Sequence, residues 1–270
     1  MIRRPFRRPS SILPALCVTF MKLILFTALS LLPLCLFSQF DDILRRGLKK
    51  QDYNEFERLV DSLKNSNDNH PNVYWDIQRE LVPGIKESVI TIEKPGKNTG
   101  VFLQVNIISK NKSIVLYELK RTRMLEYPWP PADSLLDYSK NDSLYKELEF
   151  QFSVQFGGNI NPQELFLDSV IYSVAARGCK SSTRFREKLS SMIANIDTIK
   201  LFSWLSSTNV ETQLYAVEGI YKLKQNGVKF STLRSQIIKN ILRREGVYRT
   251  CATNFITIRK ITSFAEDLLF

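Results

Sequence analysis

The chain has 270 residues, of which 44% are hydrophobic and 24% are charged. This is the composition of a folded globular protein, and it excludes a disordered or fibrous chain. The formal net charge is +11. It is unevenly placed, because residues 1–38 carry five basic and no acidic residues, and residues 39–161 are nearly neutral. Residues 162–270 carry 16 basic and 9 acidic residues, a balance of +7.

The first predicted element is a secretory signal peptide. Met21-Lys22 precedes fifteen mostly apolar residues, Leu23–Phe37, and the small residue Ser38 follows. A basic start, a short apolar run and a small residue at the cut are typical of such leaders. A membrane-spanning helix needs ~20 apolar residues, more than this run offers. We expect cleavage after Ser38, a mature N-terminus at Gln39, no stable membrane span after cleavage, and a periplasmic or extracellular location.

The segment Leu36-Phe37-Ser38-Gln39 resembles the leader ends of many uncharacterised exported bacterial proteins. The resemblance covers the predicted leader, residues 1–38, and no other part of the chain. Residues 1–20 have two interpretations. They are either upstream sequence before a true start at Met21, or an extended basic region in which Arg3-Arg4-Pro5-Phe6 loosely resembles a twin-arginine export signal.

Two cysteines, Cys179 and Cys251, remain after the predicted leader is removed. In an oxidising compartment they can form a single disulfide. Such a bridge would close a loop of about seventy residues and stabilise the fold by roughly 4 kcal/mol in the chain-entropy model. The alternative is two buried free cysteines. Both interpretations stay open, because sequence does not place the two Cα atoms.

The first elements predicted after the leader are helices. Residues 41–64 are predicted to be helical, and Asp52 with Glu55 forms a capping-box-like start within them. A second, short helix is predicted over Tyr74–Leu81, and Pro83-Gly84 ends it.

The hydrophobic period then changes from helical to alternating. Strands are predicted over Ser88–Glu93, Val101–Ser109 and Ile114–Lys120, joined as an antiparallel meander. The proline-rich segment that follows is predicted to be a stiff extended loop. Its aromatic residues, Tyr127 and Trp129, form either an exposed platform for sugar or peptide or a lid on the sheet core.

Residues 133–148 are predicted to be helical, with a break at Asn141-Asp142. Four apolar residues then alternate with polar ones over residues 150–156, which predicts a strand with one wet face. Gly157-Gly158 ends this strand and marks the predicted boundary between an α+β domain, residues 39–158, and a helical domain, residues 159–270.

The second domain is predicted to be wholly helical. Asn161-Pro162 starts its first helix, which is predicted to run to Gly178. Further helices are predicted around residues 185–193, 197–205, 209–221, 231–242 and 252–269. Helix pairs begin near residues 162, 199 and 231, which is close to the period of helical-hairpin repeats. The stretch Ile199–Ile241 resembles HEAT-like α-solenoid repeats, and this resemblance implies a binding scaffold.

The sequence offers little of the chemistry that common enzymes use. The mature chain has one histidine, His70, and its two cysteines are 72 positions apart, so no cluster has zinc-site spacing. There is no GxGxxG, P-loop, GxSxG or HExxH motif. We therefore predict no cofactor, no metal and no assigned catalytic residue. The acidic pairs Asp41-Asp42, Glu147 with Glu149, and Glu266-Asp267 are more typical of solvated surface.

Basic clusters are predicted to be solvated faces of helices, which disfavours a nucleic-acid partner. An acidic partner surface stays open, because the C-terminal half is basic. The candidate binding surface comprises Arg243 and Arg244 together with Tyr127 and Trp129.

These observations predict an α+β fold, in which a small antiparallel sheet with flanking helices precedes an all-helical, HEAT-like C-terminal half. The expected function is a non-catalytic exported protein that binds an unknown envelope protein through a groove with apolar or basic lining. The alternative is an envelope hydrolase acting on glycan or peptide, which predicts two carboxyl groups within about 10 Å of each other in a deep pocket. A third hypothesis is a ligand-binding module that uses Trp129.

Overall fold

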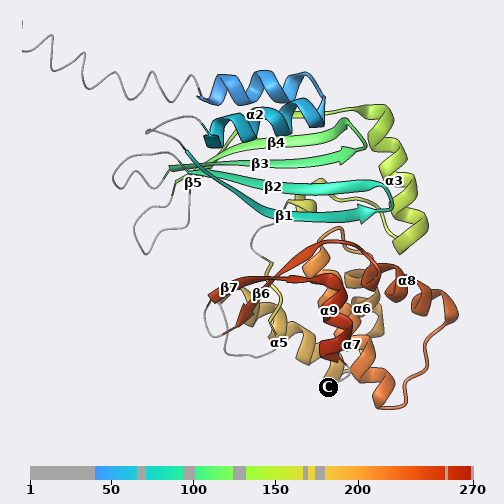
Figure 1. Cartoon of the computed structure of the whole chain (residues 1–270). Helices are drawn as coiled ribbons and strands as arrows, with labels where there is room; N and C mark the ends of the chain where they lie inside the picture. Colours follow the sequence, from blue (N-terminus) through green and yellow to red (C-terminus); the bar gives the residue numbers. More distant parts are fainter. Residues whose placement is uncertain are drawn as a thin grey trace, which may run out of the picture. The chain divides into compact units, whose positions relative to one another are not determined.

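The computed structural model describes residues 40–65, 71–93, 101–123, 132–166, 170–173, 180–252 and 255–268. The chain divides into two compact units, residues 1–47 and 48–270. In the first unit, residues 40–47 are helical. The elements labelled in Figure 1 belong to the second unit. The predicted signal peptide and His70 lie outside the described residues.

A five-stranded antiparallel sheet forms the first part of the second unit. Its strands pair in sequence order, so the predicted meander is confirmed and gains a strand at each end. The strands are β1 (Asn72–Val82), β2 (Ile85–Glu93), β3 (Val101–Lys110), β4 (Ser113–Arg123) and β5 (Ala132–Lys140). Leu103, Val105 and Ile107, which alternate along β3, are all buried.

The short helix predicted over Tyr74–Leu81 is wrong, because these residues form β1. Strand pairing between β1 and β2 shifts register at two places. Each shift disturbs the alternation of side chains between the two faces of the sheet. Val73, Ile77 and Leu81 are buried at intervals of four residues, a spacing that occurs in helices as well as in strands.

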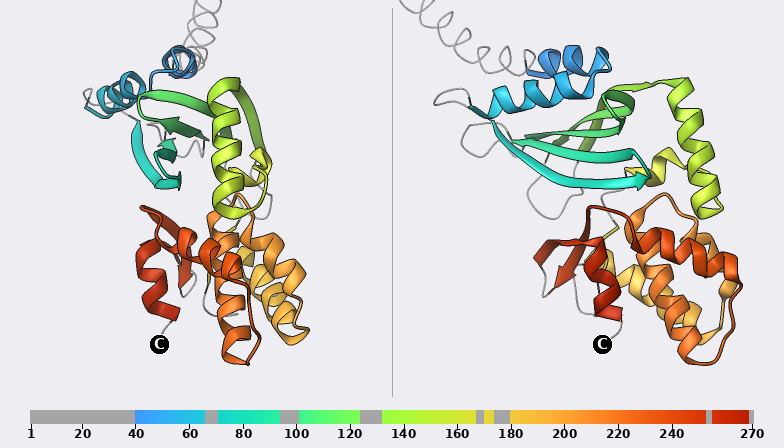
Figure 2. Two further views of the ribbon diagram at one scale, coloured as in Figure 1. Left: turned by 90° about the vertical axis from the view of Figure 1, so that its right-hand side faces the viewer. Right: turned by 45° about the vertical axis from the view of Figure 1, so that its right-hand side comes forward.

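The single helix predicted over residues 41–64 is interrupted before α2 (Tyr53–Asn65). Gln51 has a positive φ of 56°, which helical backbone does not allow. The predicted cap is confirmed, because the Asp52 carboxylate accepts a hydrogen bond from the Glu55 N–H at 2.9 Å. Figures 1 and 2 show α2 lying along one face of the sheet.

Residues 132–156 depart furthest from the sequence-based prediction. The strand β5 lies where a helix was predicted, and α3 (Asp142–Phe156) lies where a strand was predicted. Asn141 separates them, and its side chain accepts a hydrogen bond from the Leu144 N–H at 3.2 Å. Both views in Figure 2 place α3 at the end of the sheet. Lys110, at the end of β3, forms an ion pair with Glu147 there.

Burial explains why the alternation over residues 150–156 does not mark a strand. Phe152 and Phe156 are buried, whereas Phe150 and Val154 are 69% and 64% exposed. The buried residues of α3 recur every three or four positions, which is the period of an amphipathic helix. The alternating apolar residues are thus divided between two faces of α3, and Gly157 caps it with a φ of 69°.

Four of the predicted C-terminal helices are confirmed. They are α5 (Lys180–Ala194), α6 (Thr198–Leu205), α7 (Val210–Gln225) and α8 (Thr232–Leu242). The side chains of Asp197, Asn209 and Ser231 cap α6, α7 and α8, because each accepts a hydrogen bond from the backbone N–H three residues later. Side-chain caps of this kind satisfy backbone donors that the first turn leaves free.

The C-terminal half is not all-helical, which corrects the predicted fold class. The helix predicted from Asn161 ends after one turn, as α4 (Pro162–Leu165). The helix predicted over residues 252–269 is wrong in its first half, where the second strand of a hairpin lies, and a shorter helix follows that strand. These elements are β6 (Val247–Ala252), β7 (Phe255–Lys260) and α9 (Ile261–Leu268).

Tyr172 explains part of this correction, because it joins β6 instead of continuing a helix. Its N–H donates to the Arg249 carbonyl at 3.0 Å, and its carbonyl accepts from the Cys251 N–H at 2.8 Å. This segment therefore lies beside β6 as a parallel bridge between Tyr172 and Thr250.

One apolar core extends from the end of the sheet through α3 into the C-terminal helices. It includes Leu81 and Ile108 from strands, Phe152 from α3 and Leu214 from α7. The predicted domain boundary at residue 158 stays a prediction. Among the described residues, no helix combines the length and the apolar character that crossing a membrane requires.

Candidate functional site

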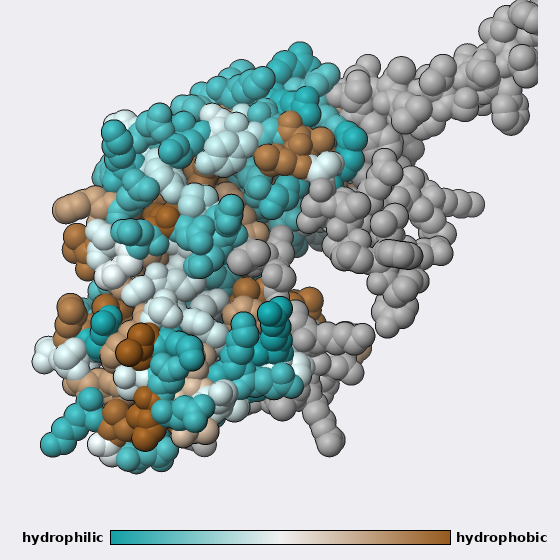
Figure 3. All heavy atoms as spheres, turned by 180° about the vertical axis from the view of Figure 1, so that it is seen from behind, coloured by the Kyte–Doolittle hydropathy of each residue, from teal (hydrophilic) through white to brown (hydrophobic). Residues whose placement is uncertain are grey.

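A groove of about 590 Å³ lies between α7 and α8, and we call it the α7–α8 groove. Its volume is in the range of pockets that hold ligands. Its floor is mainly apolar. The principal apolar side chains are Val217, Ile220, Tyr221, Val228, Phe230, Ile238 and Leu242. On the face shown in Figure 3, apolar side chains gather at several places over the helical half, between hydrophilic ones.

The connection between the two helices fixes one wall of the α7–α8 groove. Gly227, with a φ of 88°, turns the chain after α7, and the Val228 N–H donates to the Leu223 carbonyl at 3.0 Å. Phe230 then packs edge-on against Phe202, with ring centroids 6.0 Å apart. These contacts position Val228 and Phe230 in the lining before any ligand arrives.

The charged side chains among the described residues that line the α7–α8 groove are all basic. Lys224, Lys229 and Lys239 contribute to the lining, and all three are exposed. No acidic side chain is among the described residues that line it. An apolar floor with a cationic rim is complementary to an apolar surface that carries acidic residues.

A second cavity, of about 570 Å³, lies among α2, β1, β2 and the segment before β6, and we call it the polar pocket. Four glutamates take part in its lining, namely Glu57, Glu80, Glu87 and Glu245. The Tyr53 hydroxyl and the Ser88 hydroxyl lie 3.0 Å apart at its wall. Burial raises the pKa of Tyr53, which keeps this hydroxyl protonated at neutral pH.

Two of these four carboxylates are already engaged. Glu87 is buried and ion-paired to Arg79, with Oε2 2.6 Å from Nε. Glu80 accepts a hydrogen bond from the Gly84 N–H at 2.9 Å. Glu57 and Glu245 have no hydrogen bond or ion pair between their side chains and another described side chain, so they are the carboxyl groups available for acid-base chemistry.

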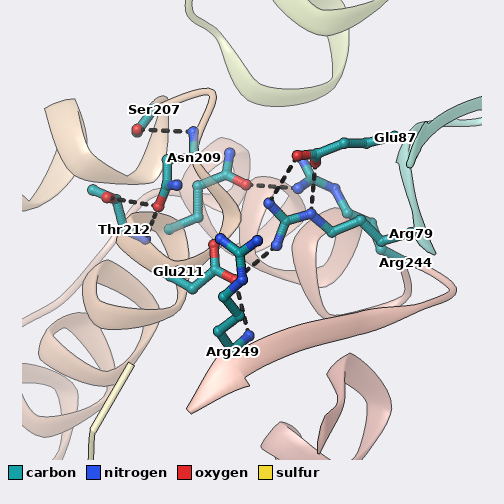
Figure 4. Close-up of polar contacts among 9 residues, drawn as sticks. Arg79, Glu87, Ser207, Asn209, Glu211, Thr212, Arg244 and Arg249 are labelled. Atoms are coloured by element: carbon teal, nitrogen blue, oxygen red, sulfur yellow. Dashed lines mark hydrogen bonds and ion pairs between the residues drawn. The ribbon is translucent and has the colours of Figure 1, made fainter. Parts of the chain in front are cut away.

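A buried charge network lies behind the polar pocket (Figure 4). The Arg79 guanidinium contacts Glu87 through two nitrogens and donates through Nη1 to Glu211 at 2.8 Å. Glu211 also accepts the Arg249 N–H at 2.9 Å. Burial alone would lower the pKa of Arg79, but the charges of Glu211 and Glu87 outweigh burial and raise it. The network therefore holds β1 and β2 to α7 and β6.

Arg244 is the second cation of this network, and it is buried instead of lying on the predicted binding surface. Its side chain is 3% exposed, donates to Gln213 Oε1 at 2.8 Å and lies 4.0 Å over the Phe156 ring. Its Nε and Nη2 have no hydrogen-bond partner among the described residues. Burial and the nearby charge of Arg79 lower the pKa of Arg244 to about 9.

A separate buried network joins α5, α7 and the Tyr172 segment. Glu218 is its centre and accepts hydrogen bonds from Arg186 Nη1 at 2.6 Å and from the Tyr172 hydroxyl at 2.8 Å. Lys222 lies 2.7 Å from the same carboxylate. Burial would raise the pKa of Glu218, but these donors outweigh it and hold the pKa below its ordinary value.

The two arginines of the predicted binding surface, Arg243 and Arg244, do not share one surface. Arg243 is exposed at the end of α8, whereas its neighbour Arg244 points into the interior. Cys251 is buried on β6, but Cys179 lies outside the described residues, so the disulfide between them stays a prediction. Tyr127 and Trp129 also lie outside the part of the chain that the structure describes.

Sequence reasoning missed both cavities. The three groove lysines belong to α7, the connection and α8, and as single charges on separate elements they form no cluster in the sequence. Sequence reasoning did not identify Arg79 as part of a site, because the β1 segment was predicted to be a helix. One signal was present: Glu211 lies in the first turn of α7, an otherwise buried helix, and a buried carboxylate needs a cationic partner.

Comparison with known proteins identifies no relative: no family model matches this chain, and no curated protein or solved structure is significantly similar to it. Within the described residues, no group of three or more histidine, cysteine, aspartate or glutamate side chains is arranged to hold a metal ion.

Proposed function

We propose that this protein is an exported, non-catalytic protein that binds another protein through the α7–α8 groove. The observation that carries the proposal is the composition of that groove, an apolar floor of about 590 Å³ with three exposed lysines and no acidic side chain in its described lining. The groove suits an apolar segment that carries aspartate or glutamate, because each lysine can contact a carboxylate at the rim.

The arrangement of the C-terminal helices supports a scaffold with HEAT-like helix pairs. Short connections join α5 to α6, α6 to α7 and α7 to α8, and α7 packs against both α5 and α6. Stacked hairpins present an extended surface, and such surfaces commonly bind other proteins. The repeat interpretation applies to Ile199–Ile241 only, because β6 and β7 follow.

Export is the second component of the proposal, and it has a test of its own. N-terminal sequencing of the mature protein from its native cells should begin at or beside Gln39. Recovery of the intact chain from the cytosol, with residues 23–37 still attached, would contradict export without affecting the groove.

Charge reversal tests the groove directly. A variant with Lys224, Lys229 and Lys239 changed to Glu should lose its partner, because the rim would repel an acidic segment. The matched control changes Arg184, Lys188 and Lys146 to Glu, which alters the net charge equally at exposed positions outside the groove.

The measurement is affinity capture of the three mature proteins from native cell envelope after chemical cross-linking, with mass spectrometry of the captured proteins. We expect at least one partner to be recovered with the wild type and the control and to be absent from the groove variant. Retention of every captured protein by the groove variant would overturn the proposed site, provided that its thermal unfolding matches that of the control.

The polar pocket supports a second candidate function, a hydrolase that uses Glu57 and Glu245. The observation in its favour is that both carboxylates line one cavity and are not held by another described side chain. The proposed binding function predicts no turnover of chito-oligosaccharides or of a fluorogenic peptide library by the mature chain. Turnover that Glu57→Gln and Glu245→Gln each abolish would establish the hydrolase instead.

A further inference from the structure

Within the part of the chain that the structure describes, β7 is the outer strand of the two-stranded sheet and pairs with β6 alone. One side of β6 is paired with β7, and the other side is covered by the Tyr172 segment. All six residues of β7 are exposed, including three large apolar side chains. Phe255 is 73% exposed, Ile256 58% and Ile258 49%. An apolar strand edge of this kind is a template for another strand.

The register of β6 shows which backbone groups of β7 point outward. Arg249 and Cys251 direct their backbone groups to Tyr172, so Thr250, between them, directs its own to β7. Thr250 pairs with Thr257. Backbone groups alternate along a strand, so Ile256 and Ile258, on either side of Thr257, direct their N–H and C=O groups outward. They have no backbone partner among the described residues.

The charge around β7 indicates the chemistry of a partner. Residues 246–260 contain three basic side chains, Arg249, Arg259 and Lys260, and no aspartate or glutamate. Two of the three lie at the end of β7 itself. The neighbouring acidic residues are Glu245, before β6, and Glu266 and Asp267, on α9. A second copy of this chain fits poorly, because residues 162–270 carry a balance of +7 in each copy and would repel one another.

We propose that β7 binds an acidic segment of another polypeptide, which adds as a strand along this edge. The N–H and C=O groups of Ile256 and Ile258 pair with the backbone of the added segment, as in other cases of strand addition. Apolar side chains of the segment cover Phe255, Ile256 and Ile258, and its carboxylates lie near Arg259 and Lys260. This site is separate from the α7–α8 groove and does not depend on the function proposed for it.

The probe for this site is a fluorescein-labelled heptapeptide of alternating valine and glutamate, added to the full mature chain. Fluorescence anisotropy should show saturable binding that weakens as salt is added. Two further peptides are controls, one with lysine in place of glutamate and one methylated at every backbone nitrogen. Neither should bind, because the first is repelled and the second cannot donate backbone hydrogen bonds. Equal binding of the N-methylated peptide would overturn strand addition.

Substitutions at Ile258 distinguish the contribution of its backbone N–H to binding from that of its side chain. Ile258→Pro removes an outward N–H that β6 does not use, so an edge strand tolerates it, and it should raise the Kd at least about tenfold. Ile258→Thr keeps the N–H and should weaken binding less. If Ile258→Pro does not match the wild type in thermal unfolding, Arg259→Glu with Lys260→Glu replaces it, with the same expected loss.

Unchanged affinity in these variants would overturn the proposal. Analytical sedimentation of the mature chain measures its oligomeric state. A dimer that Ile258→Pro dissociates would assign this edge to a second copy of the chain and overturn the proposal. The groove variant, with Lys224, Lys229 and Lys239 changed to Glu, should bind the acidic peptide as the wild type does. Loss of peptide binding in that variant would place the peptide in the groove and contradict the β7 site.

Discussion

Arg79 is the residue on whose charge the second unit depends most. It lies between two buried carboxylates, Glu87 and Glu211, so removing it leaves two uncompensated charges in the interior. Arg79→Met should lower the free energy of unfolding by about 3–5 kcal/mol, measured by urea denaturation. The control is Lys50→Ala in the exposed pair with Glu55, where we expect a change within about 0.5 kcal/mol. Equal losses in both variants would contradict a buried network.

Gly246 leaves less space for a side chain than the other glycines whose surroundings the structure describes. Its φ is +112°, and an added Cβ would lie 2.3 Å from Arg79 Cα and 2.6 Å from the Gln78 carbonyl oxygen. Gly227 has a similar φ of +88° but open space around it, so Gly227→Ala should cost only about 1–2 kcal/mol of backbone strain. Gly246→Ala should cost clearly more, because β1 must move. Similar melting temperatures for the two variants would show that this close approach is absent.

Two neighbouring arginines show that the sequence alone does not predict which of two similar side chains is buried. Arg243 and Arg244 are adjacent and chemically identical, yet one is exposed and the other is buried. Their different positions depend on how the chain leaves α8, which local pattern does not contain. The caps at Asn209 and Ser231 were predictable, because a cap acts on backbone donors within its own first turn.

The helix α3 is the element at which the structure and the sequence-based prediction differ most clearly. On the predicted strand, Phe150 and Phe152 would share one apolar face; on α3, only Phe152 is buried. Phe152→Ala should therefore lower the free energy of unfolding by ~3–5 kcal/mol. Phe150→Ala should change it by no more than about 0.5 kcal/mol. Comparable losses from both substitutions would favour the strand.

Elements were predictable where local signals agreed and not where pairing decided them. Helices α5 to α8 have a cap or a clear apolar stripe, and their existence follows from the sequence alone. The strand β1 owes its form to pairing with β2 and to two register shifts, and neither is visible in its own residues. β7 was mistaken for part of a helix for the same reason, because its form depends on pairing with β6.

The network around Glu218 predicts how stability responds to acid. The pKa of this carboxyl is lower in the folded protein than in the unfolded chain, so its contribution is complete above the unfolded value, 4.5. It is lost as pH falls through the folded value. The Glu218→Gln variant should have a lower melting temperature than the wild type at pH 7. The difference between their melting temperatures should shrink below pH 4.5. A difference independent of pH would contradict an ionised Glu218.

For the whole molecule, the mixed α+β architecture was predictable and the candidate site was not. The alternating residues of β3 and β4 specify a meander, and the helical periodicity after residue 180 specifies a bundle. The α7–α8 groove exists only when Lys224, Lys229 and Lys239 are brought together by packing of α7 against α8. A sequence without an alignment shows three separate lysines and no reason to group them.

Site-specific photo-cross-linking in the native cell envelope tests the binding function most directly. A photoreactive amino acid replaces Ile238, inside the groove, or Lys188, exposed on α5 and outside it. A partner seated between α7 and α8 predicts a discrete cross-linked protein from position 238 and none from position 188. The absence of an adduct at position 238, or the same adduct from both positions, would contradict the groove as the binding site.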